Sequence, residues 1–204
     1  MTPRQSKTLA LFLMALLLTA CTFGGKAVPL SVIEPQLDPV NVDGLMAVDW
    51  SIEVPRPITD QMRDYDRVIV RRDSTRLQVY PGISWLDSAP EMFQTLLVQA
   101  FADSGKFAGV GRTGLRARYA LVTELRRFEL VDDNEGLRVE LTVSSNLIHQ
   151  RSIKSIAART FQASISVNGS GLQSTITAFE TALSDVLNDL TQWTLQAGSE
   201  FSEG

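Results

Sequence analysis

Alternating apolar and polar residues predict β-strands over much of the chain. The two-residue period of a half-buried strand recurs in four stretches, 45–54, 118–131, 137–147 and 161–167. The second stretch changes phase between Leu125 and Phe128, which predicts a β-bulge. Polar turns separate the last three stretches, so we expect an antiparallel meander with one face in water.

Shorter apolar runs predict the remaining strands. Residues 28–33 form a first candidate strand, which Glu34-Pro35 should end. Residues 67–72 and 76–80 flank the turn-forming sequence Asp73-Ser74-Thr75. Two short runs joined in this way predict a β-hairpin.

The helical period appears first in residues 88–104. Apolar side chains recur there at the i, i+3, i+4, i+7 and i+8 positions of a helix that lies on a core. Ser88 and Glu91 have the spacing of a capping box, and Pro90 falls in the first turn, where its missing N–H does no harm. Gly105 should end this helix.

A second helix is expected to open at residues 168–171 and to run to about Ala197. Its apolar residues recur at alternating spacings of three and four, which also suits a coiled coil. Docking on the open face of the sheet is the preferred interpretation. The predicted fold is therefore α+β, a two-layer α/β arrangement with a mostly antiparallel sheet and two main helices packed on one face.

The N-terminus has the layout of a secretion signal. Arg4 and Lys7 precede the apolar run of residues 9–18, which is too short to span a membrane by itself. The run ends in Leu18-Thr19-Ala20-Cys21, which resembles the lipobox of bacterial lipoproteins. An ordinary signal peptide beside a chance cysteine is the alternative, but bulky Leu18 stands where such peptides prefer a small residue.

This resemblance divides the chain and implies its location. We expect a signal peptide at 1–20, a lipidated tether at 21–28, one domain at 29–197 and a frayed tail at 198–204. Cys21 would carry a diacylglycerol and acyl chains such as palmitate. Because Thr22 replaces the aspartate that commonly retains lipoproteins at the inner membrane, an outer-membrane protein facing the periplasm is expected.

The charge balance narrows the possible partners. The net charge is −4, and loss of Arg4 and Lys7 with the signal peptide would make it about −6. An acidic domain has no overall attraction for nucleic acid or anionic lipid surfaces. Cys21 is the only cysteine, so the chain cannot form an intrachain disulfide.

The motifs that could carry chemistry are isolated. The sequence G-x-G-x-x-G at residues 109–114 follows a helix and precedes a strand, whereas a phosphate loop needs the reverse order, so we interpret it as a turn. His149 is the only histidine, and a solvent-facing or locally bonded side chain is expected. Residues 132–136 lack the later ligands of a calcium loop. We therefore predict no catalytic residue, no cofactor and no metal.

Two surface features remain as candidates for contacts. Arg67, Arg71, Arg72 and Arg76 alternate with acidic residues, so a solvated face of ion pairs is expected. A loop at residues 80–86 carries four large apolar side chains, which are Tyr80, Ile83, Trp85 and Leu86. We expect this loop to border a partner interface, and the alternative is that Trp85 packs in the core.

A set of short segments, in order along the chain, resembles the ABC-type transport auxiliary lipoprotein family, whose members accompany MCE-type lipid transporters. The segments are 54–57 (VPRP), 65–68 (YDRV), 77–80 (LQVY), Trp85, 92–97 (MFQTLL), 101–107 (FADSGKF), 121–128 (LVTELRRF), 156–161 (IAARTF), Ala178-Phe179 and Trp193. Arg118 departs from the pattern, which has an acidic residue before the tyrosine.

The resemblance implies a sheet with helices packed on it, no catalytic residues, and a membrane-tethered accessory role beside an MCE-domain protein and an ABC permease and ATPase. Members of the family can form rings, so a homo-oligomer is expected. Two other functions stay open, which are a structural or assembly lipoprotein of the envelope and a membrane-tethered hydrolase.

Overall fold

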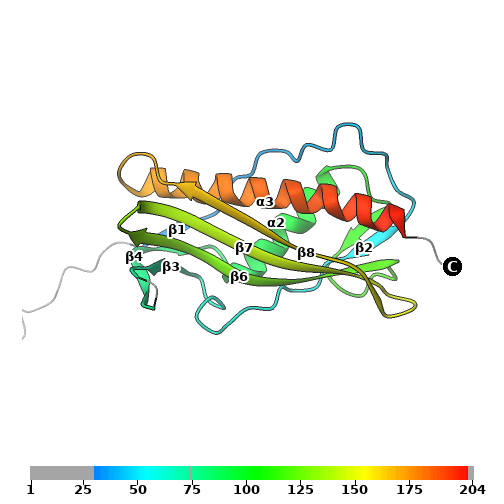
Figure 1. Cartoon of the computed structure of the whole chain (residues 1–204), viewed down its shortest axis with the longest axis horizontal. Coiled ribbons are helices and arrows are strands. Elements are labelled where there is room, and N and C mark those ends of the chain that lie inside the picture. Colours follow the sequence, from blue (N-terminus) through cyan, green and yellow to red (C-terminus); the bar gives the residue numbers. More distant parts are fainter. Residues whose placement is uncertain (1–29, 74, 202–204) are drawn as a thin grey trace, which may run out of the picture.

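The computed structural model describes residues 30–73 and 75–201 as two helices and eight strands (Figure 1). The strands are β1 (Ser31–Ile33), β2 (Ser51–Glu53), β3 (Arg67–Arg71), β4 (Leu77–Trp85), β5 (Gly109–Gly111), β6 (Tyr119–Asp133), β7 (Gly136–His149) and β8 (Lys154–Ser166). The helices are α2 (Ala89–Asp103) and α3 (Leu172–Glu200).

All eight strands belong to one mixed sheet, which corrects the expectation of a mostly antiparallel one. The long strand β6 is its centre. β7 pairs antiparallel along one edge of β6, while β2 and β3 pair in parallel with opposite ends of the other edge. β4 joins β3 antiparallel, and β1 and β5 add parallel strands at the outside. The strands of each parallel pair are separated by long connections that contain other elements. Parallel pairing requires such connections, because the chain must return to the start of the neighbouring strand.

The predicted meander of β6, β7 and β8 is confirmed. Both pairings are antiparallel, and the side chains of β7 alternate between the core and a solvated face. The register of β6 and β7 shifts between Leu125 and Arg127, which confirms the expected bulge. Figure 1 shows α3 lying along β7 and β8, so the long helix is docked on the sheet.

Helix α2 begins where it was predicted but without the predicted capping box. Pro90 lies in its first turn, and Gly105 follows it with a φ of 63°. The Ser88 side chain makes no capping hydrogen bond. Its hydroxyl instead accepts a hydrogen bond from Arg56 Nη2 at 3.3 Å, and Glu91 lies 3.7 Å from Arg56 Nε. Arg56, from the segment between β2 and β3, therefore contacts both side chains in place of the reciprocal cap.

Helix α3 is longer than predicted. It continues past Ala197 to Glu200, so the tail does not begin to fray at residue 198. Gly198 is buried, and its backbone lies so close to the Trp50 ring that a side chain would collide with it. Tertiary packing on Trp50 thus stabilises the last turn of α3, which helix propensity alone would not predict at a glycine.

Both helices contribute to one continuous core, which contains two groups of aromatic rings. The proximal aromatic cluster, near β1, consists of Trp85, Phe128 and Phe179, with ring centroids 4.9–5.1 Å apart. The distal aromatic cluster, at the other end of the sheet, contains Trp50, Phe107, Tyr119, His149 and Phe201. Edge-to-face contacts dominate both groups.

The predicted hairpin is confirmed as β3 and β4, but β4 is longer than expected. It extends through residues 80–85, which corrects the prediction of a loop there. The carboxylate of Asp73 holds the turn by accepting hydrogen bonds from the backbone N–H groups of Thr75 and Arg76, at 3.0 and 2.8 Å. The bond from Thr75 and the side chain of Arg76 lower the pKa of Asp73 far below its usual range.

Candidate functional site: a cleft between residues 34–40 and α2

An extended segment after β1 forms one wall of the candidate site. Four polar side chains, spaced four residues apart on one stripe of α3, bind its backbone. The Gln36 N–H donates to Glu180 Oε1 at 3.0 Å and the Asp38 N–H to Ser184 Oγ at 3.3 Å. The Asn41 N–H donates to Asn188 Oδ1, and Gln192 Nε2 donates to the Asn41 carbonyl, both at 2.8 Å. These bonds satisfy the backbone without a neighbouring strand.

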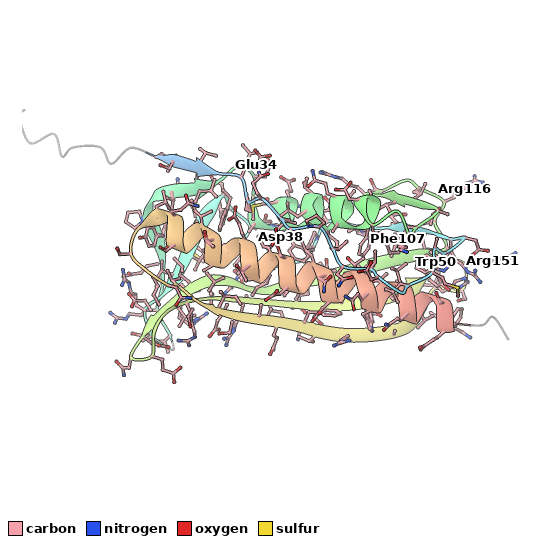
Figure 2. The ribbon with its side chains drawn as sticks, turned by 90° about the horizontal axis from the view of Figure 1, so that it is seen from above. Glu34, Asp38, Trp50, Phe107, Arg116 and Arg151 are labelled. Atoms are coloured by element: carbon pink, nitrogen blue, oxygen red, sulfur yellow. The ribbon has the colours of Figure 1, made fainter. Side chains whose placement is uncertain are left out.

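Helix α2 forms the opposite wall, and the two walls enclose a cleft of about 410 Å³. Its base is apolar, with Met92 and Leu96 from α2. Carboxylates stand at its rim, from Glu34, Asp38, Asp87 and Asp103. Figure 2 shows Glu34 and Asp38 on the extended segment, between β1 and the two helices. A volume of this size suits part of a lipid or a few side chains of a partner.

The chemistry of the cleft favours binding. It contains no histidine or cysteine, and its residues provide aliphatic surface and negative charge. Among residues 30–73 and 75–201, no group of three histidine, cysteine, aspartate or glutamate side chains could hold a metal ion. An apolar base with an acidic rim suits a ligand or peptide segment that combines aliphatic and cationic groups.

The four residues predicted to border an interface are divided between the core and the surface. Trp85 and Ile83 are buried, and Trp85 packs on Phe128 and Phe179. Trp85 therefore packs in the core, which was the alternative interpretation of this residue. Leu86 is 56% exposed and lines the cleft, whereas Tyr80 is half-buried against the core. Only the far end of the predicted surface therefore reaches the candidate site.

The glycine motif at 109–114 does not form a phosphate loop. Its first three residues were predicted to belong to a turn, but they form a strand. Residues 109–111 are β5, an outer strand paired in parallel with β2. Glycine suits this position because a side chain on Gly109 would meet Ser51 Oγ at 2.9 Å. His149 is locally bonded as predicted, with Nδ1 2.9 Å from Ser152 Oγ, but it is buried rather than solvent-facing.

The arginines of the β3–β4 hairpin form ion pairs as expected, but one pair is internal. Arg72 pairs with Asp132 and Arg76 with Asp73 at the surface. Arg71 Nε lies 2.6 Å from Glu129 Oε1, which raises the pKa of Arg71 through that hydrogen bond. Glu129 is fully buried, and Arg63 also binds it. The alternation of β6 gave a weak signal for this site, since Glu129 stands between two core residues.

The tether prediction concerns residues outside the described part of the chain. Cys21 and the boundaries at residues 20 and 28 lie there. In the part of the chain that the structure describes, neither helix is long and apolar enough to cross a membrane.

A family model and one curated relative match this sequence. A family model described as the ABC-type transport auxiliary lipoprotein component matches residues 32–191. An uncharacterized protein of Bradyrhizobium diazoefficiens is 26% identical over an alignment of 152 residues, and the match covers 72% of this chain. The chain spans only 40% of that relative's length.

Two solved structures are similar along almost their whole length. Protein XCC0632 from Xanthomonas campestris has a TM-score of 0.80 and 30% identity, covering 83% of this chain and 97% of that chain. An uncharacterized protein has a TM-score of 0.65 at 13% identity, covering 81% and 99%, and shows the fold alone. Because the family model matches residues 32–191, which are most of this chain, the chain belongs to the ABC-type transport auxiliary lipoprotein family.

Proposed function

We propose that the protein is the periplasmic accessory component of an ABC/MCE-type transporter that moves lipids or hydrophobic compounds across the cell envelope. Its role is to bind partners, without catalysis of its own. The family match over residues 32–191 carries this proposal. The partners are an MCE-domain protein and the ABC permease and ATPase of the same system.

Cys21 anchors the protein in the outer membrane by its lipid in this proposal. Two or more acyl chains hold a protein durably on a bilayer, whereas one chain binds marginally. The residues between Cys21 and Leu30 can reach about 30 Å at most. The cleft beside β1 therefore stays near the membrane surface, where a lipid-transporting partner would meet it.

The cleft is the proposed contact site for a basic, partly apolar segment of the MCE-domain partner. The acidic rim attracts cationic side chains, and Met92 and Leu96 offer aliphatic surface below them. The segment at 34–40 is fixed by α3 before binding, so that little ordering entropy is lost.

Purification from cross-linked membranes tests this function. The native protein should recover the MCE-domain protein and the permease encoded with it. Reversal of the rim charges with Asp38→Lys and Asp87→Lys should lower this recovery about fivefold or more. Asp49→Lys with Glu135→Lys is the matched control, because both residues are exposed and neither lines the cleft. Equal losses from both pairs would refute the cleft as contact site, and no recovery by the native protein would refute the transport role.

The anchor has its own test. Intact mass spectrometry should find a diacylglyceryl group on the mature protein, and Cys21→Ser should release the protein from the outer membrane. A native protein that leaves the membrane unmodified would refute the anchor.

Self-association is the remaining part of the proposal. β8 pairs only with β7 among the described strands, and residues 160–166 on it carry no charge. A long uncharged edge favours pairing with another chain. Sedimentation should show a homo-oligomer that Ser164→Lys weakens, whereas a monomer at all concentrations would contradict this.

A further inference from the structure

The turn between β7 and β8 ends in a strained and exposed isoleucine. Ile153 is 83% exposed and has a φ of 54°. Among residues 30–73 and 75–201 it is the only non-glycine residue with a positive φ. A β-branched residue strongly disfavours this conformation, which glycine or asparagine adopts readily. Strain and apolar exposure together suggest that the side chain serves a contact outside the domain.

Basic side chains surround this isoleucine. The pairing of Tyr119 with His149 places residues 116–118 beside the turn, and the Gln150 N–H donates to the Arg118 carbonyl at 3.0 Å. The basic tip, as we define it, consists of Ile153 and four exposed cations, which are Arg116, Arg118, Arg151 and Lys154. Figure 2 shows Arg116 and Arg151 together at one end of the molecule, far from β1.

Most other arginines form ion pairs among the described residues, whereas the cations of the basic tip do not. Arg112 and Arg159 also lack an ion pair there, and they contact Thr95 and the Phe161 ring instead. Ion pairs in the described part of the chain involve other arginines, which are Arg56, Arg63, Arg67, Arg71, Arg72, Arg76, Arg126, Arg127 and Arg138. Arg118 lies over the Tyr119 ring, 5.7 Å from its centroid. None of the four tip cations pairs with a described carboxylate.

Three described carboxylates lie on segments next to the tip and leave it positive. Asp49 lies two residues before Ser51, whose carbonyl accepts a hydrogen bond from the Arg118 N–H at 3.1 Å. Glu53 accepts a hydrogen bond from Gln150 Nε2 at 3.1 Å. Glu200 precedes Phe201, whose ring lies 5.3 Å from that of His149. Four cations against these three carboxylates give a local positive charge on a chain whose net charge is −4. The tip can therefore bind an anionic surface that the rest of the domain would avoid.

We propose that the basic tip binds the surface of an anionic phospholipid bilayer, with Ile153 inserted among the lipid headgroups. One protruding aliphatic side chain ringed by cations suits the apolar and anionic layers of a bilayer interface. A protein interface needs roughly 800 Å² on each partner, usually with aromatic anchors, which this convex turn does not offer. The membrane is thus the partner that the tip fits.

The tip alone would bind a membrane weakly. This inference therefore rests in part on the proposed function, in which the lipid anchor already holds the domain at the membrane. Each basic residue near an anionic surface strengthens partitioning roughly fivefold. A short tether gives an effective concentration in the millimolar range, at which such a weak contact becomes populated. The part of α3 between Glu180, beside Gln36, and the Phe201 contact spans about 30 Å. Anchor and tip would then fix the long axis of the domain along the membrane.

Fluorescence quenching tests the proposal. The chain from residue 22, which contains every described residue, is held by an N-terminal hexahistidine on vesicles with a nickel-chelating lipid, so that the test does not depend on lipidation of Cys21. Ser152→Cys carries an environment-sensitive dye. Vesicles of phosphatidylcholine with about 30% phosphatidylglycerol and a nitroxide-labelled lipid should quench the dye at least threefold more than vesicles without phosphatidylglycerol.

Matched variants separate the tip from general charge effects. Arg151→Glu with Lys154→Glu should abolish the extra quenching. Arg72→Glu with Arg76→Glu changes the charge equally on the β3–β4 hairpin, at the other end in Figure 1, and should retain it. Ile153→Asn should relieve the backbone strain and raise the Tm, yet lower the quenching about twofold. Equal quenching on both kinds of vesicle, equal loss in both charge variants or unchanged quenching in Ile153→Asn would overturn the proposal. If the tip binds only protein, the dye at residue 152 should not be quenched by the nitroxide-labelled lipid, and this result would also overturn the proposal.

Discussion

The two aromatic clusters of the core solve the same packing problem in different ways. The proximal cluster of Trp85, Phe128 and Phe179 contains one tilted and two edge-to-face ring contacts, and Trp85 is 2% exposed. The distal cluster mixes its rings with polar groups. Tyr119 donates a hydrogen bond to the Gly198 carbonyl, and His149 contacts Ser152.

Hydroxyl groups continue this polar character between the sheet and α3. Thr123 and Ser145 oppose each other on β6 and β7, and both face the core. Thr191 and Thr194 on α3 are fully buried and donate to helix carbonyls. The proximal cluster is therefore held by contacts between aromatic rings, whereas the contact of α3 with the sheet also buries hydroxyl groups. Thr191 and Thr194 are hydrogen-bonded there, and Thr123 and Ser145 have no partner among the described residues.

Truncation of the proximal cluster should have the largest effect. Trp85→Ala removes a buried indole that packs on the rings of Phe128 and Phe179, so the free energy of unfolding should fall by about 3–5 kcal/mol. Urea denaturation followed by circular dichroism measures this loss. Leu86→Ala is the control. The Leu86 side chain is 56% exposed, so its truncation should lower the free energy of unfolding far less. Similar values for the two variants would contradict the packing of Trp85 in the core.

The distal cluster should tolerate no additional methyl group at Gly198. A Cβ atom there would lie 2.5 Å from Trp50 Cζ2 and 2.8 Å from Cη2. Alanine normally favours a helix over glycine by about 1 kcal/mol, but overpacking should reverse the sign and destabilise the protein by about 1–3 kcal/mol. Thermal unfolding of Gly198→Ala measures this, with exposed Ser199→Ala as control.

A second substitution can confirm the cause. Trp50→Leu makes room for the new methyl group, so the double variant with Gly198→Ala should lose less stability than the sum of the two single variants. Additive losses would mean that the collision is not the reason.

These contacts also show what the sequence could predict. Period-two alternation located β6, β7 and β8 together with the bulge, because one face of each strand is buried over many residues. Strand direction was not predictable, since the parallel neighbours of β6 come from distant parts of the chain. The same holds for Gly198, where the partner ring is that of Trp50.

The candidate site was less accessible to sequence analysis than the fold. Residues 34–41 contain turn-forming residues and no strand period, yet α3 orders their backbone through Glu180, Ser184 and Asn188. Their four-residue spacing lies on a polar helix face, which any solvated helix also has. In the same way, Leu86 was expected at a surface with Trp85, and the fold separated the two.

The hydroxyl group of Tyr119 should make a modest contribution. It donates a hydrogen bond of 2.9 Å to the Gly198 carbonyl near the end of α3. Tyr119→Phe keeps the ring and removes this bond, so the free energy of unfolding should fall by about 1 kcal/mol. Tyr65→Phe is the control at a 62% exposed position and should change little. Hydrogen exchange at the last turn of α3 should rise in Tyr119→Phe alone, and unchanged exchange would argue against this role.

Removal of a buried hydroxyl from the contact of α3 with the sheet should have the smallest effect and the opposite sign. Thr123 is 2% exposed, and its Oγ1 has no hydrogen-bond partner among the described residues. Valine has nearly the same shape and no polar group to desolvate, so Thr123→Val should raise the free energy of unfolding by about 1 kcal/mol. Thr142→Val, on the solvated face of β7, should stay within about 0.5 kcal/mol of the native protein. Destabilisation by Thr123→Val would contradict this prediction and would fit an ordered water that Thr123 and Ser145 bind together.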